Sequence, residues 1–263
     1  MLKKYSRKIK RILTSFIPDH IYNQIQTSRE LNITIIKGRK DYLGYIAKHF
    51  EKRMISEKHI ADSNINNKEW LTNGFCIICD KKVRFKNNWN NHQTGPRYGK
   101  IPCYRERMIC PVCGLNNRMR FAAFYLDKFL QEKKLNNATV YLYEQVTPFF
   151  NYVKNKYSTV KVYGSEFLGE GYMPGQIIDG LQHEDAQNLS FDTASIDIIL
   201  ANDVFEHIPN ISKALSEAFR VLKGKGRLIF TIPFCPTEIE TINRAEISNG
   251  KIVHNLPERY HGN

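Results

Sequence analysis

Four cysteines, arranged as two Cys-x-x-Cys pairs, are the residues of this chain whose type and spacing most clearly predict a chemistry. The pairs are Cys76 with Cys79 and Cys110 with Cys113, and 30 residues separate them. Each pair presents two thiolates from one tight turn, and two pairs complete the tetrahedral set of sulfur ligands that Zn²⁺ prefers. Because the protein fills all four positions, we expect a closed, structural zinc site. A catalytic zinc would need an open position.

Carboxylates at the ends of three predicted strands form the second chemical feature. Glu144, Glu166 and Asp203 each follow a run of residues that predicts a β-strand. The carboxyl ends of parallel strands meet at one edge of a sheet, where ligands bind. Glu166 lies 22 residues after Glu144, close to the spacing of about 20 at which an acid binds ribose hydroxyls in dinucleotide-binding folds. Singly, each would be a solvated strand-end carboxylate; jointly, they favour a site.

These side chains must be positioned by a strand–helix–strand unit between Leu189 and Phe234. Its first strand, Ile196–Leu200, is a short apolar run typical of a parallel strand covered on both faces. Its second strand is expected at Arg227–Ile232, so the unit is a right-handed crossover in a parallel sheet. A helix and two further strands are predicted upstream, at residues 119–130, 139–143 and 160–163.

The helix of this unit is expected to begin after Asn210, acting as N-cap, and to end at Gly224 and Gly226. Its apolar residues recur at steps of three and four and predict one buried stripe. The stripe consists of Ile211, Ala214, Leu215, Ala218, Phe219 and Leu222.

The motifs of this half of the chain resemble those of class I S-adenosylmethionine-dependent methyltransferases of the type 11-like group. The likeness is carried by SFDTASIDIILANDVFEHIPN, residues 190–210, and by ALSEAFRVLKGKGRLIFTIPF, residues 214–234. The resemblance implies a Rossmann-like, mostly parallel α/β sheet, S-adenosylmethionine as cofactor, and methyl transfer. The alternative is any other doubly wound nucleotide-binding sheet, because a fold alone does not fix a function.

The resemblance also implies a set of cofactor-binding residues. The segment from Glu184 to Leu189 is similar to the family's "D-A-x-x-L" turn, in which the aspartate, here Asp185, meets the adenine amino group. Glu144 and Gln145 would take the amino-acid end of the cofactor. All the candidates together are Glu144, Gln145, Thr147, Gly164, Glu166, Asp185, Ala186, Asn202 and Asp203.

One departure from the family pattern concerns the turn after the first strand. In the family this turn is rich in glycine, which lets the cofactor approach the bare backbone. Here the turn, residues 144–148, reads Glu-Gln-Val-Thr-Pro and contains no glycine. A non-catalytic protein that has lost cofactor binding therefore stays as an alternative.

A hydroxyl acceptor would require a general base, since methyl transfer itself mainly needs alignment of the acceptor and exclusion of water. His207 is the first candidate because the pKa range of histidine suits proton transfer near neutrality, and His261 is the second. The alternative for His207, with Glu206, is a helix-start contact beneath the cofactor.

The segment Cys110–Arg120, with the pattern Cys-Pro-x-Cys-Gly-x-x-x-Arg-x-Arg, resembles a bacterial group of zinc-ribbon methyltransferases associated with surface-polysaccharide synthesis. This resemblance favours a glycan or other small molecule as acceptor. The polar segment between the cysteine pairs is expected to have no core of its own, so that the metal holds it together. A nucleic-acid-binding methyltransferase is the rival interpretation, with phosphate contacts from Arg84, Lys86, Arg97, Arg105 and Arg107.

Basic charge is concentrated near the start of the chain. The net charge is +13, and residues 1–60 hold 14 Lys and Arg against 5 Asp and Glu. Residues 1–16 predict an amphipathic basic helix that lies on an anionic membrane surface, contacts RNA, or packs as a solvated helix. A second helix is expected near 41–55. No apolar run approaches the ~20 residues of a membrane span, and the few cysteines suit a reducing compartment. We therefore predict a cytoplasmic protein. If the helix of residues 1–16 lies on a membrane surface, the protein would be peripheral at the membrane.

Three segments are predicted: a basic helical leader at 1–70, a zinc-ribbon module at 71–118 and a Rossmann-like methyltransferase domain at 119–263. Near the end of the chain, Asn249-Gly250 predicts a β-hairpin. The last two strands of the family pattern are not evident. The strand 227–232 would then be an unpaired apolar edge. Either the chain is a truncated version of a longer protein, or a partner, such as a second copy in a homodimer, covers this edge.

Overall fold

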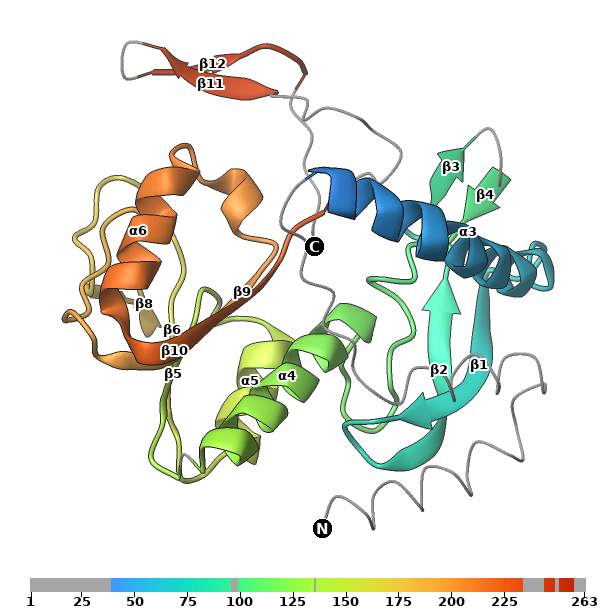
Figure 1. Ribbon diagram of the computed structural model, residues 1–263, viewed down its shortest axis with the longest axis horizontal. Helices are drawn as coiled ribbons and strands as arrows, with labels where there is room; N and C mark the ends of the chain where they lie inside the picture. Colours follow the sequence, from blue (N-terminus) through green and yellow to red (C-terminus); the bar gives the residue numbers. More distant parts are fainter. Residues whose placement is uncertain (1–38, 96–98, 135, 234–243, 249–250, 258–263) are drawn as a thin grey trace. The chain divides into compact units, whose positions relative to one another are not determined.

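The computed structural model describes residues 39–95, 99–134, 136–233, 244–248 and 251–257 (Figure 1). The chain divides into two compact units, Met1–Ile65 and Asn66–Asn263. In the first unit the described residues form one helix, α3 (Arg39–Asp62), which is longer than the helix predicted near 41–55. The predicted amphipathic helix at residues 1–16 lies outside the described residues. Among the described helices, none combines the length and the apolar character needed to cross a membrane.

Residues 69–116, here called the cysteine module, contain two antiparallel strand pairs. Strands β1 (Glu69–Cys76) and β2 (Lys81–Asn88) pair along their whole length, and β3 (Gln93–Gly95) pairs with β4 (Gly99–Ile101). Phe85 of β2 is buried against Cys76 and Cys110. The expectation that this polar segment has no core of its own was therefore wrong, because every second residue of a strand can point inward.

The second half of the chain forms a four-stranded parallel sheet in the order β10-β9-β5-β6. Tyr141 illustrates the register, since it lies opposite Tyr163 on one side and Ile199 on the other. The predicted α/β fold with a parallel sheet is thus confirmed. The strands are β5 (Thr139–Leu142), β6 (Lys161–Gly164), β9 (Ile196–Asn202) and β10 (Leu222–Thr231).

Helices cover both faces of this sheet (Figure 1). Helices α4 (Asn117–Lys133) and α5 (Pro148–Lys156) lie on one face, and α6 (Ile211–Val221) lies on the other. Alternate residues of the central strands serve the two layers: Leu142 and Leu200 pack with α4 and α5, whereas Tyr141 and Ala201 pack with α6. Every residue of β9 except Asp197 is buried, as its mainly apolar sequence predicted.

The buried face of α6 differs from the predicted stripe. Asn210 caps the helix as expected, with its Oδ1 accepting a hydrogen bond from the backbone N–H of Lys213 at 3.0 Å. The residues that face the sheet are the small Ala214, Ala218 and Val221. The larger apolar residues of the predicted stripe point outward; they are Ile211 (46% exposed), Leu215 (40%) and Phe219 (82%). Ala214 and Ala218 of the predicted stripe are therefore confirmed as buried, whereas the prediction was wrong for Ile211, Leu215 and Phe219.

The expected helix stop at Gly224 and Gly226 was also wrong. Helix α6 ends at Val221, and both glycines belong to β10, whose pairing with β9 shifts register between Leu222 and Arg227. A Cβ at Gly226 would lie 3.0 Å from the backbone oxygen of Asp197 in β9, so close strand approach explains this glycine. Within the described part of the chain, β10 pairs with β9 alone.

The connection from β6 to β9, residues 165–195, contains no helix. It holds a short pair, β7 (Ile177–Ile178) with β8 (Leu181–Gln182). The hairpin predicted near the chain end is confirmed as β11 (Ala245–Ser248) with β12 (Lys251–His254), which pair antiparallel.

Candidate functional site

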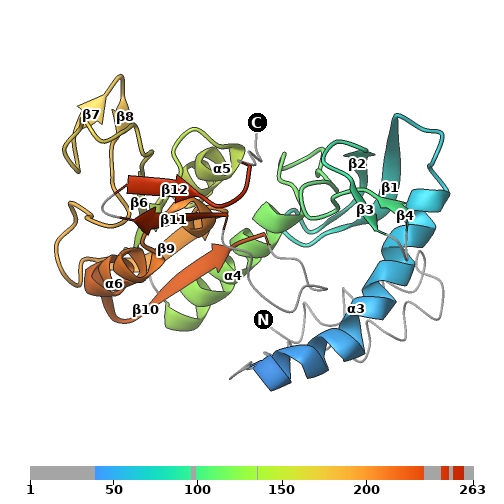
Figure 2. The ribbon, with the colours of Figure 1, turned by 90° about the horizontal axis from the view of Figure 1, so that it is seen from above.

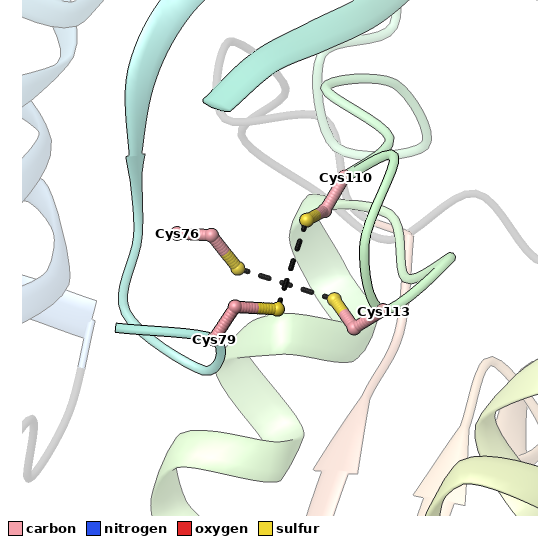
Figure 3. A group of neighbouring side chains, drawn as sticks. All are labelled: Cys76, Cys79, Cys110 and Cys113. Atoms are coloured by element: carbon pink, nitrogen blue, oxygen red, sulfur yellow. Dashed lines mark hydrogen bonds between the residues drawn. The ribbon is translucent and has the colours of Figure 1, made fainter. Parts of the chain in front are cut away.

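The four cysteines converge on one point, as Figure 3 shows. Their sulfur atoms all lie within 4.8 Å of one another, with Cys76 Sγ 3.9 Å from Cys113 Sγ and Cys79 Sγ 3.8 Å from Cys110 Sγ. A tetrahedral zinc with Zn–S bonds of about 2.3 Å places its sulfur ligands about 3.8 Å apart. The cluster therefore has the donor type and the spacing of a closed zinc site.

The environment of the thiols is consistent with metal ligation. The hydrogen bond with Cys76, together with burial, raises the pKa of Cys113, and burial raises the pKa of Cys79 to about 11. Metal-free, these two thiols keep their protons at neutral pH. Because zinc binds the thiolate, loading the cluster must release protons, and its affinity must fall as the pH is lowered.

The second candidate region is the edge formed by the carboxyl ends of β5, β6, β9 and β10, here called the carboxyl edge. At its centre, Asn202 at the end of β9 donates a hydrogen bond from Nδ2 to Glu144 Oε1 at 2.6 Å. Burial raises the pKa of Glu144, and the hydrogen bonds from Thr147 and Asn202 oppose this only in part. The predicted pair Glu144 and Asn202 is thus brought together in a buried contact between neighbouring strands.

The glycine-free turn after β5 is held by the acid at the end of β6. Glu166 Oε1 accepts hydrogen bonds from the backbone N–H groups of Gln145 (2.7 Å) and Val146 (3.1 Å). The Gln145 side chain in turn donates to Gly180 O (3.0 Å) and accepts from the Gln182 N–H (2.9 Å). The turn is therefore shaped by side chains from neighbouring segments instead of by glycine.

Thr147 and Gly164 have clear structural roles at this edge. Thr147 is the N-cap of α5, with Oγ1 accepting from the Phe150 N–H at 3.1 Å. At Gly164 a Cβ would lie 2.4 Å from Cε2 of Phe150 and 2.7 Å from the backbone oxygen of Glu144. Only glycine fits there without displacing its neighbours, because real Cβ atoms do not approach other atoms within 3.0 Å.

The turn after β8 carries Asp185 and Ala186. Asp185 Oδ1 accepts from the backbone N–H of Gln187 at 2.8 Å, and Ala186 is buried. Beside them lies Glu184, a residue that sequence reasoning passed over; it is 2% exposed and accepts hydrogen bonds from Gln182 Nε2 and the Ser190 N–H. In sequence alone, nothing separates this buried Glu184 from an exposed acid.

Asp203 is contacted by Arg105 of the cysteine module and by Arg118 of α4. Its backbone has a positive φ of 57°, and its Oδ1 accepts from Thr231 Oγ1 at 2.8 Å. Arg105 Nη2 contacts the same oxygen, and Arg118 Nε lies 3.4 Å from Oδ2. Glu106 lies between the two arginines and accepts from both.

Arg105 was predicted as a phosphate contact and Arg118 was seen only as part of a motif. The signal that could have found them is an Arg-x-Arg on each side of the second cysteine pair: residues 105–107 before it, and residues 118–120 after it in the first turns of a helix. An arginine so close to a fixed metal turn has a defined backbone position.

The candidate bases are placed differently from the carboxylates. His207 lies in the short helix η1 (Phe205–His207), just after the end of β9, and its side chain is exposed. His261 lies outside the described residues. Neither role is tested by the geometry.

Residues 128–230 match the family model described as a methyltransferase domain. The match covers about two fifths of the chain and runs from within α4 almost to the end of β10, so it includes all four strands of the parallel sheet. The sheet and its helices are therefore similar to a methyltransferase domain. The cysteine module lies outside the matched residues.

Solved structures similar to this chain are also methyltransferases by description. One is a candidate S-adenosyl-L-methionine-dependent methyltransferase from Methanococcus maripaludis, with 15% identity and a TM-score of 0.31 over 42% of this chain and 56% of that one. Another, from Bacillus halodurans, is a candidate methyltransferase with 24% identity and a TM-score of 0.28 over 40% and 45% of the two chains. The chain spans about half the length of these structures. No curated protein matches it.

Proposed function

We propose that this protein transfers a methyl group from S-adenosylmethionine to an acceptor. The observation that carries the proposal is the match of residues 128–230 to a methyltransferase domain, in which the predicted cofactor residues gather at the carboxyl edge. When bound, S-adenosylmethionine would supply an electrophilic methyl group on a sulfonium. The protein would bind it, align the acceptor and exclude water.

Free acceptor oxygens support the proposal that a nucleoside binds at the carboxyl edge. Glu166 uses Oε1 for the two turn amides, and Asp185 uses Oδ1 for Gln187. The second oxygen of each carboxylate therefore keeps acceptor capacity, as judged from the described residues. Ribose hydroxyls and an adenine amino group are donors, so Glu166 would take the ribose and Asp185 the base. Glu144 and Gln145 would lie toward the amino-acid end.

The cysteine module would hold one structural Zn²⁺ through Cys76, Cys79, Cys110 and Cys113. Full protein ligation leaves no coordination position for a substrate, which supports a structural role. The acceptor we propose is a glycan or another small molecule, and His207 is the proposed base for a hydroxyl acceptor. We also propose that the protein is cytoplasmic and binds a membrane surface peripherally through residues 1–16. A homodimer would form through the β10 edge.

The test is calorimetric titration of zinc-loaded protein with S-adenosylmethionine and with its demethylated product. We expect binding of both, weakened in Glu166→Ala because the variant loses the ribose acceptor and the support of the 145–146 turn. Glu170→Ala is the matched control, since Glu170 is an exposed acid in the following loop. No heat from the wild-type protein at millimolar ligand would refute the proposal and favour a non-catalytic protein.

The acceptor class is tested separately. A screen that starts with sugars should find methylation that depends weakly on ionic strength. The rival, an RNA acceptor, requires binding that falls steeply with salt because phosphate contacts release counterions. Arg105 is a poor phosphate contact in this rival, since its guanidinium is already paired with Glu106 and Asp203.

A further inference from the structure

The second cysteine pair lies immediately before helix α4, and hydrogen bonds connect the two. The Cys110 N–H donates to Leu115 O at 3.0 Å, which closes the metal turn. The Asn116 side chain then caps α4 by accepting from the Met119 N–H at 2.8 Å. A turn whose cysteines bind a metal would therefore also fix where α4 begins. Figures 1 and 2 show α4 between the strands of the cysteine module and the parallel sheet.

The backbone positions of two arginines follow from this arrangement. The Arg118 N–H donates to Arg105 O, and the Asn117 N–H donates to Arg107 O, both at 3.0 Å. Residues 105 and 118 are therefore held side by side, one in the loop before the cysteine pair and one in the first turn of α4. Their guanidinium groups extend in the same direction, because both contact Glu106 and Asp203.

Glu106 fixes the two guanidinium groups from the module side. It receives Arg118 Nε at 2.8 Å and Nη2 at 3.0 Å, Arg105 Nη1 at 2.7 Å, and Asn116 Nδ2 at 2.8 Å. Burial lowers the pKa of Arg118, but its interactions with Glu106, Asp203 and Glu144 outweigh burial and leave the pKa raised. Both arginines therefore present fixed positive charge toward the sheet.

At the end of β9, the Asp203 carboxylate pairs with both guanidinium groups. The side chains of Arg118 and Asp203 are 11% and 10% exposed, so water screens their attraction little. Asp203 also has the positive φ of 57° that non-glycine residues rarely adopt. Its N–H donates to Thr231 O at 2.9 Å. The conformation that ends β9 beside the carboxyl edge is thus held by Arg105 of the cysteine module, by Arg118 of α4 and by two contacts from β10.

We propose that Arg105 and Arg118 are positioning residues that hold Asp203 in its observed conformation; these contacts are here called the lock. Through the lock, the metal in the cysteine module and the cofactor at the carboxyl edge stabilise each other's binding, which is here called the coupling. The coupling to the cofactor rests on the proposed function. The lock itself does not. Coupled sites in proteins typically change each other's affinity by about 5 to 150-fold, and the factor is the same in both directions.

The lock is tested first, by hydrogen exchange of the Asp203 amide in the full chain. Arg118→Met should speed this exchange about tenfold or more, because a charge-assisted contact to a buried carboxylate is lost. Asp203→Asn, which keeps the size of the side chain, and removal of zinc by a chelator should do the same. Arg107→Met is the matched control, since Arg107 bonds Asn90 O and should leave the amide unchanged. Unchanged exchange in Arg118→Met, Asp203→Asn and zinc-free protein would overturn the lock.

The coupling is tested by zinc competition with a chelator, with and without S-adenosylhomocysteine. If the wild type binds this ligand, its presence should raise zinc affinity by at least about fivefold, and Arg118→Met should abolish the increase. Equal zinc affinity with and without bound ligand would overturn the coupling. Failure of the wild type to bind the ligand at all would refute the proposed function and with it the coupling, while the exchange experiment would still decide the lock.

Discussion

Gly164 offers the sharpest test of the geometry at the carboxyl edge. In Gly164→Ala the new Cβ would lie 2.4 Å from Cε2 of Phe150 and 2.7 Å from the backbone oxygen of Glu144. The Phe150 ring is buried at the start of α5, and the second contact is with backbone, so neither neighbour can give way cheaply. Overpacking of this kind costs about 1–3 kcal/mol, and two simultaneous clashes place the expected loss of stability near the upper limit, about 3 kcal/mol.

The assay is equilibrium unfolding in urea together with thermal unfolding. A loss of about 3 kcal/mol should lower the melting temperature by roughly 6–12 °C, since about 2–4 °C per kcal/mol applies to a unit of this size. Gly224→Ala is the matched control: it adds the same methyl group to a glycine of the same sheet where nothing lies within 4 Å. The control should stay within about 0.5 kcal/mol of the wild type.

A double variant identifies the cause. Phe150→Leu removes the ring that meets the new Cβ, so Gly164→Ala should destabilise the Phe150→Leu background less than it destabilises the wild type. The clash with the Glu144 backbone oxygen stays, so the rescue should be partial. If Gly164→Ala unfolds like the control, or if its cost is the same in both backgrounds, the packing assigned to this edge is refuted.

Four further predictions address the other sites. Cys110→Ser, or chelation, should release one zinc per chain, measured with a chromogenic chelator, and should lower the melting temperature; unchanged melting would contradict a structural metal. Glu144→Gln should gain stability relative to the wild type as the pH rises above about 4.5, because the raised pKa makes ionisation of buried Glu144 unfavourable; a difference independent of pH in urea titrations would contradict this. His207→Ala should lower turnover about 100-fold if it is the base, and an unchanged rate at saturating acceptor removes it from that role. The intact chain should sediment with anionic vesicles at low salt, and loss of residues 1–17 without effect would exclude that role for the leader.

The fold could be predicted from the sequence where a single physical pattern dominates. The mainly apolar segment 196–200 predicted a strand buried on both faces, and it lies in β9, one of the two central strands of the sheet. The side chain of Asn210 likewise predicted a helix N-cap, and the spacing of the cysteine pairs predicted a four-sulfur cluster. In these cases the decisive interaction is between residues close in sequence, so a short stretch of sequence is enough to predict the local structure.

The parts that escaped prediction depend on contacts between distant residues. The face that α6 buries depends on how closely the helix approaches the sheet, and small residues at 214 and 218 allow a close approach that larger ones would prevent. The pairing of Asp203 with Arg105 joins residues 98 positions apart, so it could not be predicted from a local sequence pattern. The cofactor-binding roles stay predictions, since the structure brings the acids to one edge without testing what they bind.

The turn after β5 has a consequence for how its sequence can change over evolutionary time. The conformation of a glycine-rich turn is set by its own residues. The conformation of this turn depends on Glu166, an acid that follows the neighbouring strand β6. Substitutions of the exposed Val146 are therefore tolerated as long as its N–H group stays, but loss of Glu166 or of the Gln145 amide is not. Searches for relatives of this chain should accordingly look for an acid about twenty residues after the first strand, in place of the missing glycines.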